Sequence, residues 1–258
     1  KTLIVNELDN TGSEKTLINT TNNVARLSWF KTQLSIEELS SKVAAVGEFS
    51  LKGKVDFVPP YLVDLALSSS IDNFELLPQL SHSEQKVSLK GDLADLVTTI
   101  SNVGELTLTA KMSVDVTNAN LPYKLKADVS QFILPDDIAN VITPSTLLLN
   151  SEGDLNRHVI DLKSNISGFG YQDAALELQA TYSEQTFKIK TLYFEEFKEN
   201  SRLDITGELQ LGNRLLWDVK VNSSGISLPN IDKRLSGRLQ GNIYSKGFWQ
   251  DNEWAFTL

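Results

Sequence analysis

Apolar and polar residues alternate along most of this chain. The clearest run is an aliphatic series with a polar residue after each member: Leu106, Leu108, Ala110, Met112, Val114 and Val116. Successive side chains of a β-strand point to opposite faces, so this alternation places the aliphatic groups on one face and the polar groups on the other. The pattern predicts an all-β protein built from one-sided strands.

The same alternation recurs from Phe49 to Ile243. The apolar positions that we expect to share one face are Phe49, Leu51, Val55, Phe57, Leu106, Leu108, Met112, Val114, Leu125, Val129, Leu176, Leu178, Leu203, Ile205, Leu209, Trp217, Val219, Val221, Leu235, Leu239 and Ile243. Residues typical of turns separate these runs, at 117–120, 151–153, 212–213 and 222–225. Turn-forming residues between alternating runs predict strands joined by short connections.

Few segments favour a helix. Residues 35–43 begin with Ser35 and carry Glu38 three positions later, a capping-box pattern that predicts a short helix. Residues 135–142 could form one or two further turns. Residues 92–103 have apolar groups at helical spacing, but their Gly-Asp-Leu start recurs at Gly153 before a plainly alternating run. We therefore interpret 92–103 as strand, turn and strand.

The chain is expected to form one continuous segment. Similar Leu-Pro phrases end at Pro78, Pro135 and Pro229, at uneven spacing that favours a repeat of several strands with variable loops. Composition from Gly47 onward is uniform and predicts no domain boundary, so residues 1–258 are treated as one unit. Residues 1–25 alternate poorly and are expected to form an edge or a frayed segment. A start at Lys1 favours a fragment of a longer protein.

Composition excludes several function classes. The 258 residues include no cysteine, which removes disulfides, thiolate metal sites and thiol nucleophiles. The net charge is −9, and no Lys/Arg cluster is dense enough to neutralise a run of phosphates, so nucleic acid is not an expected partner. No apolar run reaches the length of about 18 residues that a membrane helix needs.

No catalytic or metal-binding motif is present. His82 and His158 stand among polar residues without an accompanying metal or nucleophile signature, and we expect both to be exposed. The adjacent acids Glu195 and Glu196 would point to opposite faces of a strand and make a poor catalytic pair. The glycines of residues 166–171 are interpreted as a bulge or turn. The sequence therefore predicts a protein that is not an enzyme and uses no cofactor.

One-sided strands require something to cover their apolar face. A second sheet, closure into a barrel, or an external ligand could each do so. The residue pattern alone favours a sandwich or a barrel, because most one-sided strands line a closed core.

The last hundred residues resemble a known family. Residues 207–258 open a strand with Gly-x-Leu, place Trp217 on the next strand, and continue through Leu235-x-Gly237-x-Leu239-x-Gly241, Gly247 and Trp254. This order of motifs resembles the recurring unit of the TamB family of AsmA-like proteins, and residues 158–197 resemble the unit before it. The fragment would belong to the amino-terminal half of such a protein.

This resemblance implies a repeating β-groove, or β-taco: an elongated, twisted, curled antiparallel sheet with an apolar concave face. The residues predicted above to share one face would then line the groove and contact lipid. Such proteins are thought to carry phospholipid between the inner and outer membranes of Gram-negative bacteria. The resemblance further implies a periplasmic location, an inner-membrane anchor on the full-length protein, and pairing with TamA through a region absent from this chain.

Two functions remain open from the sequence. In the first, the groove shields phospholipid acyl chains, at roughly 0.8 kcal/mol for each buried methylene. In the second, exposed strand edges act as a scaffold for outer-membrane or autotransporter proteins by β-strand addition.

Overall fold

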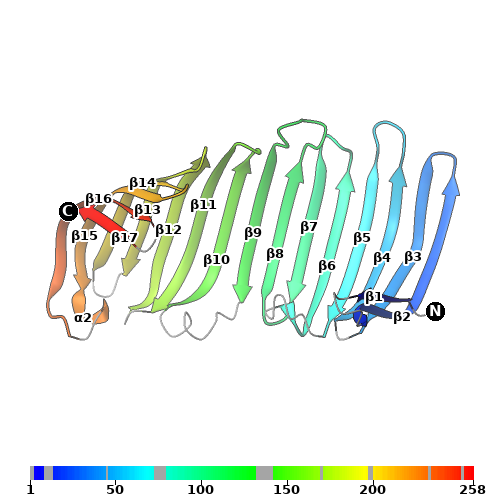
Figure 1. The fold of residues 1–258 in the computed structure, drawn as a ribbon, viewed down its shortest axis with the longest axis horizontal. Helices are drawn as coiled ribbons and strands as arrows, with labels where there is room; N and C mark the ends of the chain where they lie inside the picture. The colour runs from blue at the N-terminus through cyan, green and yellow to red at the C-terminus, as the bar shows by residue number, and fades with distance from the viewer. Residues whose placement is uncertain are drawn as a thin grey trace. The chain divides into compact units, whose positions relative to one another are not determined.

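The computed structural model describes residues 3–8, 14–44, 46–72, 80–131, 142–168, 171–196, 200–231, 234–250 and 253–258. Strands account for most of these residues, and the only helix among them is the four-residue α2 (Leu228–Ile231). Figure 1 labels the strands β1 to β17. They fall into two units, β1 to β8 and β9 to β17. The prediction of an all-β, antiparallel fold is confirmed.

Unit 1 is an antiparallel meander. Its strands are β1 (Leu3–Leu8), β2 (Glu14–Phe30), β3 (Gln33–Val43), β4 (Gly47–Asp56), β5 (Val63–Ile71), β6 (Ser83–Gly91), β7 (Leu96–Val103) and β8 (Thr107–Val114). Each strand pairs with the next one in the chain. Figure 1 shows β3 to β8 side by side in chain order.

Unit 2 repeats this organisation. Its strands are β9 (Tyr123–Gln131), β10 (Ile142–Gly153), β11 (Arg157–Gly168), β12 (Tyr171–Ser183), β13 (Thr186–Glu196), β14 (Ser201–Gln210), β15 (Leu215–Ser227), β16 (Arg238–Gln250) and β17 (Glu253–Thr257). Consecutive strands again pair antiparallel throughout. The connections described within it are mostly tight hairpins, and the turn predicted at 212–213 is one of them.

Glycines inside the strands allow the sheets to curl. Gly53 in β4 and Gly207 in β14 both have φ near +145°, a backbone conformation that side chains disfavour. A Cβ on Gly53 would lie 2.0 Å from the Asp64 carbonyl oxygen, and one on Gly207 would lie 2.2 Å from that of Asp218. Glycine kinks of this kind introduce curvature into a sheet. Within each unit the described strands form one open, curled sheet, so the sandwich and barrel favoured by the residue pattern alone are wrong.

The helix predicted over residues 35–43 is also wrong. These residues form most of β3, which pairs with β2 on one side and β4 on the other. A β-bulge between Ile36 and Leu39 adds one residue, so these two side chains share a face at a spacing of three. The helix was predicted from the capping-box pair Ser35 and Glu38, and pairing with both neighbouring strands overrides that local preference.

Some of the other local predictions are confirmed, and others are wrong. The turn between β6 and β7 and the turn at 117–120 are confirmed. The residues predicted as turns at 151–153 and 222–225 instead lie within β10 and β15, where the second group coincides with a bulge. The glycine stretch that starts at Ile166 contains a register shift, as expected. Residues 135–141 lie outside the described part of the chain, and Ile142 begins β10.

Residues 1–25 contribute β1 and most of β2, from Glu14 to Ala25, in the described ranges. The expectation that this segment is an edge or frayed stays a prediction, as does the continuity of residues 1–258 as one segment.

Candidate functional site

One face of each sheet is apolar, and we call it the inner face. In unit 1 it carries Leu51 and Leu67, and in unit 2 it carries Leu162 and Leu178. Strand alternation and register place the other inner-face residues on the same side. In β5 every inner residue from Val63 to Ile71 is half-buried or buried, and every outer residue between them is exposed. The sheet is therefore amphipathic, as the sequence predicts.

An uninterrupted aliphatic row crosses the inner face of unit 2. Cross-strand register aligns one residue from each strand from β9 to β16: Ala127, Leu149, Leu162, Leu178, Leu192, Ile205, Val221 and Ile243. We call this row the unit 2 track. The unit 1 track, from β2 to β8, consists of Ala25, Leu39, Leu51, Leu67, Val87, Ile100 and Ala110. Both tracks run across the strands.

The side chains of the described residues do not seal the inner faces. Among the described residues, only five hydrophobic side chains are buried: Ile71, Ala174, Ala180, Ile189 and Ile226. Residues of the tracks such as Leu67, Leu162 and Leu178 are only half-buried, and Ile100 is 39% exposed. A closed core would bury such residues almost completely. Apolar surface therefore remains accessible along each inner face.

Most of the predicted lining residues lie on these inner faces. In unit 1 they are Phe49, Leu51, Val55, Leu108, Met112 and Val114. In unit 2 they are Leu125, Val129, Leu176, Leu178, Leu203, Ile205, Leu209, Trp217, Val219, Val221, Leu239 and Ile243. The structure gives their position, and their contact with lipid stays a prediction.

Three predicted lining residues lie outside the strands. Leu106 is in the turn before β8, and its carbonyl accepts a hydrogen bond from the Asn102 side chain. Phe57 follows β4, is 51% exposed, and stacks on Trp29 with 5.0 Å between ring centroids. Leu235 precedes β16 and is 46% exposed. Alternation continued past the strand ends at these positions, so periodicity alone placed them in strands.

A hollow of about 770 Å³ opens on the inner face of unit 1. Its lining includes the track residues Ala25, Leu39, Leu51 and Leu67, together with Phe49. This volume is within the range of small-molecule sites. Its walls offer mainly aliphatic contact and few groups that could fix one ligand in one orientation.

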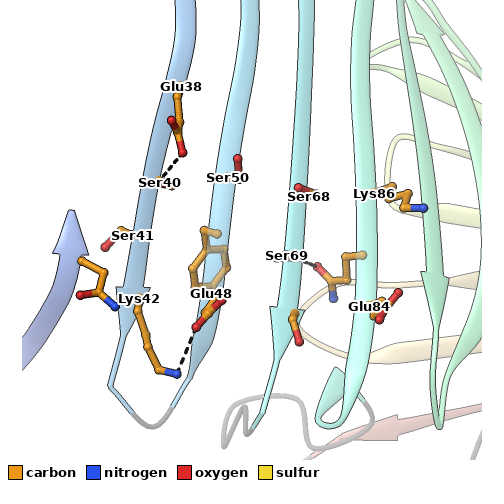
Figure 2. A pocket seen from close by; sticks show the side chains of 14 residues that line it. Glu38, Ser40, Ser41, Lys42, Glu48, Ser50, Ser68, Ser69, Glu84 and Lys86 are labelled. Atoms are coloured by element: carbon orange, nitrogen blue, oxygen red, sulfur yellow. Dashed lines mark hydrogen bonds and ion pairs between the residues drawn. The ribbon is translucent and has the colours of Figure 1, made fainter. Parts of the chain in front are cut away.

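The outer faces are polar and carry several ion pairs. Figure 2 shows a second hollow, of about 390 Å³, where the serines Ser40, Ser50 and Ser68 of adjacent strands lie among charged side chains. The Lys42 Nζ lies 3.1 Å from Glu48 Oε1 at this hollow. On the outer face of unit 2, Lys163 Nζ lies 3.2 Å from Glu177 Oε1. Such exposed pairs add little stability but keep the outer surface hydrated.

A polar row on the unit 1 inner face was not predicted from the sequence. Ser69, Gln85 and Asn102 occupy neighbouring positions on β5, β6 and β7, next to the aliphatic track. Ser69 Oγ donates to Gln85 Oε1 at 3.4 Å, and Asn102 is 2% exposed. The sequence alone could have predicted that these three residues face inward. Each is two positions away from an apolar inner-face residue of the same strand: Leu67, Val87 or Ile100.

An aromatic group on the unit 2 inner face was also missed. Tyr123, His158 and Tyr182 lie in one cross-strand row, near the hairpin ends of β9, β11 and β12. His158 is half-buried, unlike His82, which is exposed as expected. Sequence neighbours alone gave no indication that strand pairing brings the imidazole between two tyrosine rings.

Nothing in the described part of the chain suggests a metal or a membrane helix. No cluster of three or more His, Cys, Asp or Glu side chains could hold a metal ion there. The described segments also contain no helix with the length and apolarity needed to span a bilayer.

Comparison with known proteins agrees with this architecture. The family model described as TamB, N-terminal domain, matches residues 1–258. No curated protein and no solved structure matches the chain. The family consists of non-enzymatic proteins of the Gram-negative envelope. Its model covers the whole sequence, and the chain therefore belongs to the TamB amino-terminal domain family.

Proposed function

We propose that this chain forms part of a conduit that shields phospholipid acyl chains on its inner faces during transport between the inner and outer membranes. The observation that supports the proposal most strongly is the accessible aliphatic surface of the two tracks. Half-buried Leu67 and Leu178 lie where a closed protein would place a core. An acyl chain would supply the missing apolar contact.

The dimensions suit an acyl chain. Strands lie about 4.8 Å apart, so the seven steps from β9 to β16 extend the unit 2 track over roughly 34 Å. Extended hydrocarbon chains of membrane lipids are shorter than this. Each track could therefore hold one acyl chain that lies along the track, or several acyl chains that cross it side by side.

The energetics favour movement over fixed binding. Burial of a methylene gains about 0.8 kcal/mol, so a chain of about 16 carbons gains on the order of 12 kcal/mol when fully shielded. The track offers Leu, Ile, Val and Ala at every step, and successive positions therefore have similar contact energies. A chain could slide along such a surface without passing a polar barrier.

Site-specific photocrosslinking tests the proposal. A photoreactive residue at Leu178 or Val219 would face the inner side of unit 2, whereas one at Lys220 would face the outer side of unit 2 and one at Thr109 the outer side of unit 1. We expect phospholipid adducts from the first pair and few from the second. Equal labelling of the two faces, or no lipid adducts at Leu178 and Val219, would contradict the proposal.

The same experiment separates the two functions left open by the sequence. A scaffold that recruits outer-membrane proteins by strand addition would give protein adducts near its strand edges and no lipid adducts inside. For the full-length protein we further propose a periplasmic location, an inner-membrane anchor and pairing with TamA. These rest on family membership.

A further inference from the structure

We propose that Tyr123, Ser151 and His158 form a hydrogen-bonding site on the inner face of unit 2 that holds the phosphodiester group of a phospholipid. The proposal rests on the proposed function, since it assumes that lipid occupies this face. It adds an orientation: the headgroup lies toward one end of the strands and the acyl chains lie toward the aliphatic track.

The three side chains form one connected group. The Tyr123 hydroxyl lies 2.9 Å from His158 Nδ1 and 3.0 Å from Ser151 Oγ. Tyr123 and His158 belong to β9 and β11, and the intervening strand contributes Gly153, which has no side chain to separate them. Their rings approach to 5.8 Å between centroids across this gap.

His158 is held from both sides. The Tyr182 ring of β12 stacks on the imidazole at 5.9 Å and an interplanar angle of 20°. Tyr123, Ser151, His158 and Tyr182 are all half-buried, so the group is fixed in place while one side remains accessible. A ring packed in this way has lost most of its rotational freedom before any ligand binds.

One arrangement of these hydrogen bonds makes the imidazole a donor. If Ser151 donates to the Tyr123 oxygen, the Tyr123 hydroxyl can donate to His158 Nδ1. The imidazole then carries its proton on Nε2, which becomes a donor. Among the described residues, Nε2 has no partner of its own. An anionic oxygen is the acceptor that gives the strongest hydrogen bond to such a donor.

The position of the group matches the polarity of a phospholipid. Along β11, His158 is followed on the inner face by Ile160 and then by Leu162 of the track. Four residues of strand cover about 13 Å, which leaves room for the glycerol backbone and first methylenes between the phosphate and the track. Tyrosine side chains suit this level, because they present an apolar ring and a polar hydroxyl.

Histidine NMR tests the proposal directly, because the chain has two histidines. The probes are dihexanoyl phosphatidylglycerol below its micelle concentration, dihexanoylglycerol without phosphate, and inorganic phosphate. With histidine-labelled protein, we expect the phospholipid to shift the His158 ring signals saturably and to leave those of exposed His82 unchanged. Dihexanoylglycerol, which lacks the phosphodiester, should not reproduce the shift.

Two conservative variants serve as matched tests. Tyr123→Phe keeps the ring but removes the hydroxyl that fixes the imidazole, and we expect it to lose most of the phospholipid-induced shift. Tyr182→Phe keeps the stacking ring on the opposite side of His158 and should retain the shift. Equal responses in the two variants would overturn the assignment.

The remaining outcomes separate this proposal from the conduit itself. Lipid adducts at Leu178 together with an unmoved His158 would overturn the phosphodiester site and leave the conduit standing. Absence of both lipid adducts and shifts would overturn both. A full-size shift with inorganic phosphate alone would identify a general anion site and overturn the assignment to lipid.

Discussion

The indole of Trp217 lies directly over Gly247 on the neighbouring strand. A Cβ on Gly247 would come within 2.4 Å of Trp217 Cζ2, a separation that no side chain could tolerate. Trp217 also donates from Nε1 to Ser245 Oγ at 3.0 Å on the same strand, β16. The absence of a side chain at Gly247 therefore leaves the space that this inner-face indole occupies.

This contact predicts that Gly247→Ala displaces the indole and destabilises unit 2. Overpacking typically costs about 1–3 kcal/mol, and the added methyl would also meet the Ala255 carbonyl oxygen. Urea unfolding followed by tryptophan fluorescence measures the loss. Gly212→Ala is the control, because its added Cβ would lie 3.4 Å from the Gln185 side chain and 4.0 Å from the Arg214 carbonyl oxygen, both ordinary contact distances. Similar stabilities of the two variants would contradict the contact.

The unit 1 track predicts that one charge on the inner face blocks lipid movement. Leu67→Glu would place a carboxylate in the middle of the track and on the wall of the larger hollow. A passing acyl chain would have to displace the water around it, so we expect at least a tenfold loss of lipid transfer between donor and acceptor vesicles. Far-UV circular dichroism should remain that of the parent protein.

Ala66→Glu is the matched control for Leu67→Glu. Ala66 is adjacent in sequence, exposed, and on the outer face opposite Lys52, where a new carboxylate gains a partner. The control should transfer lipid at the parent rate. Equal transfer by the two variants would show that the track is not the lipid path.

Period-two alternation was sufficient to predict the fold class and the facing of most residues. Alternation predicts the facing because each strand is amphipathic. Leu176, Leu178 and Ala180 lie on the same face whichever strands pair with them. The capping-box pair Ser35 and Glu38 wrongly predicted a helix in β3, where a bulge also changes the spacing of Ile36 and Leu39 from two to three. Such bulges depend on pairing with both neighbouring strands, which local sequence does not encode.

The polar and aromatic groups of the inner faces were missed for the same reason, because they depend on strand pairing. Tyr123 and His158 are 35 residues apart and meet because two strand registers align them over Gly153. Nothing near either residue signals the other. Cross-strand register would be needed to predict the site, whereas composition and periodicity were enough to predict the apolar face around it.

The turn between β10 and β11 predicts a pH-dependent contribution to stability. The amide N–H groups of Asn156 and Arg157 donate to Asp154 Oδ1 at 2.7 and 3.0 Å and lower the pKa of this carboxyl. A lowered pKa means that the ionised form stabilises the fold above the unfolded value of about 3.9, and that this gain disappears as pH falls through the folded value. Asp154→Ala should therefore be less stable than the parent at pH 7 and nearly equal to it near pH 2.

Thermal unfolding across this pH range measures the effect. Glu152→Ala is the control, because Glu152 lies within β10 and not in the turn. The difference between parent and Asp154→Ala should shrink monotonically on acidification. A difference that grows as the pH falls would have the wrong sign and would rule out this role for the carboxylate.

The uncovered inner faces also predict that single-chain amphiphiles stabilise the native protein. Anything that binds the folded state and not the unfolded chain adds RT ln(1 + [L]/Kd), or about 1.4 kcal/mol at roughly ten times Kd. Decyl maltoside below its micelle concentration should therefore raise Tm with the logarithm of its concentration, and maltose at the same concentration should not. Leu67→Glu should weaken the response more than Ala66→Glu, because only the first alters the apolar hollow. A Tm that does not change with decyl maltoside would mean that the inner faces do not accept alkyl chains, since the same contacts would have to form with a phospholipid.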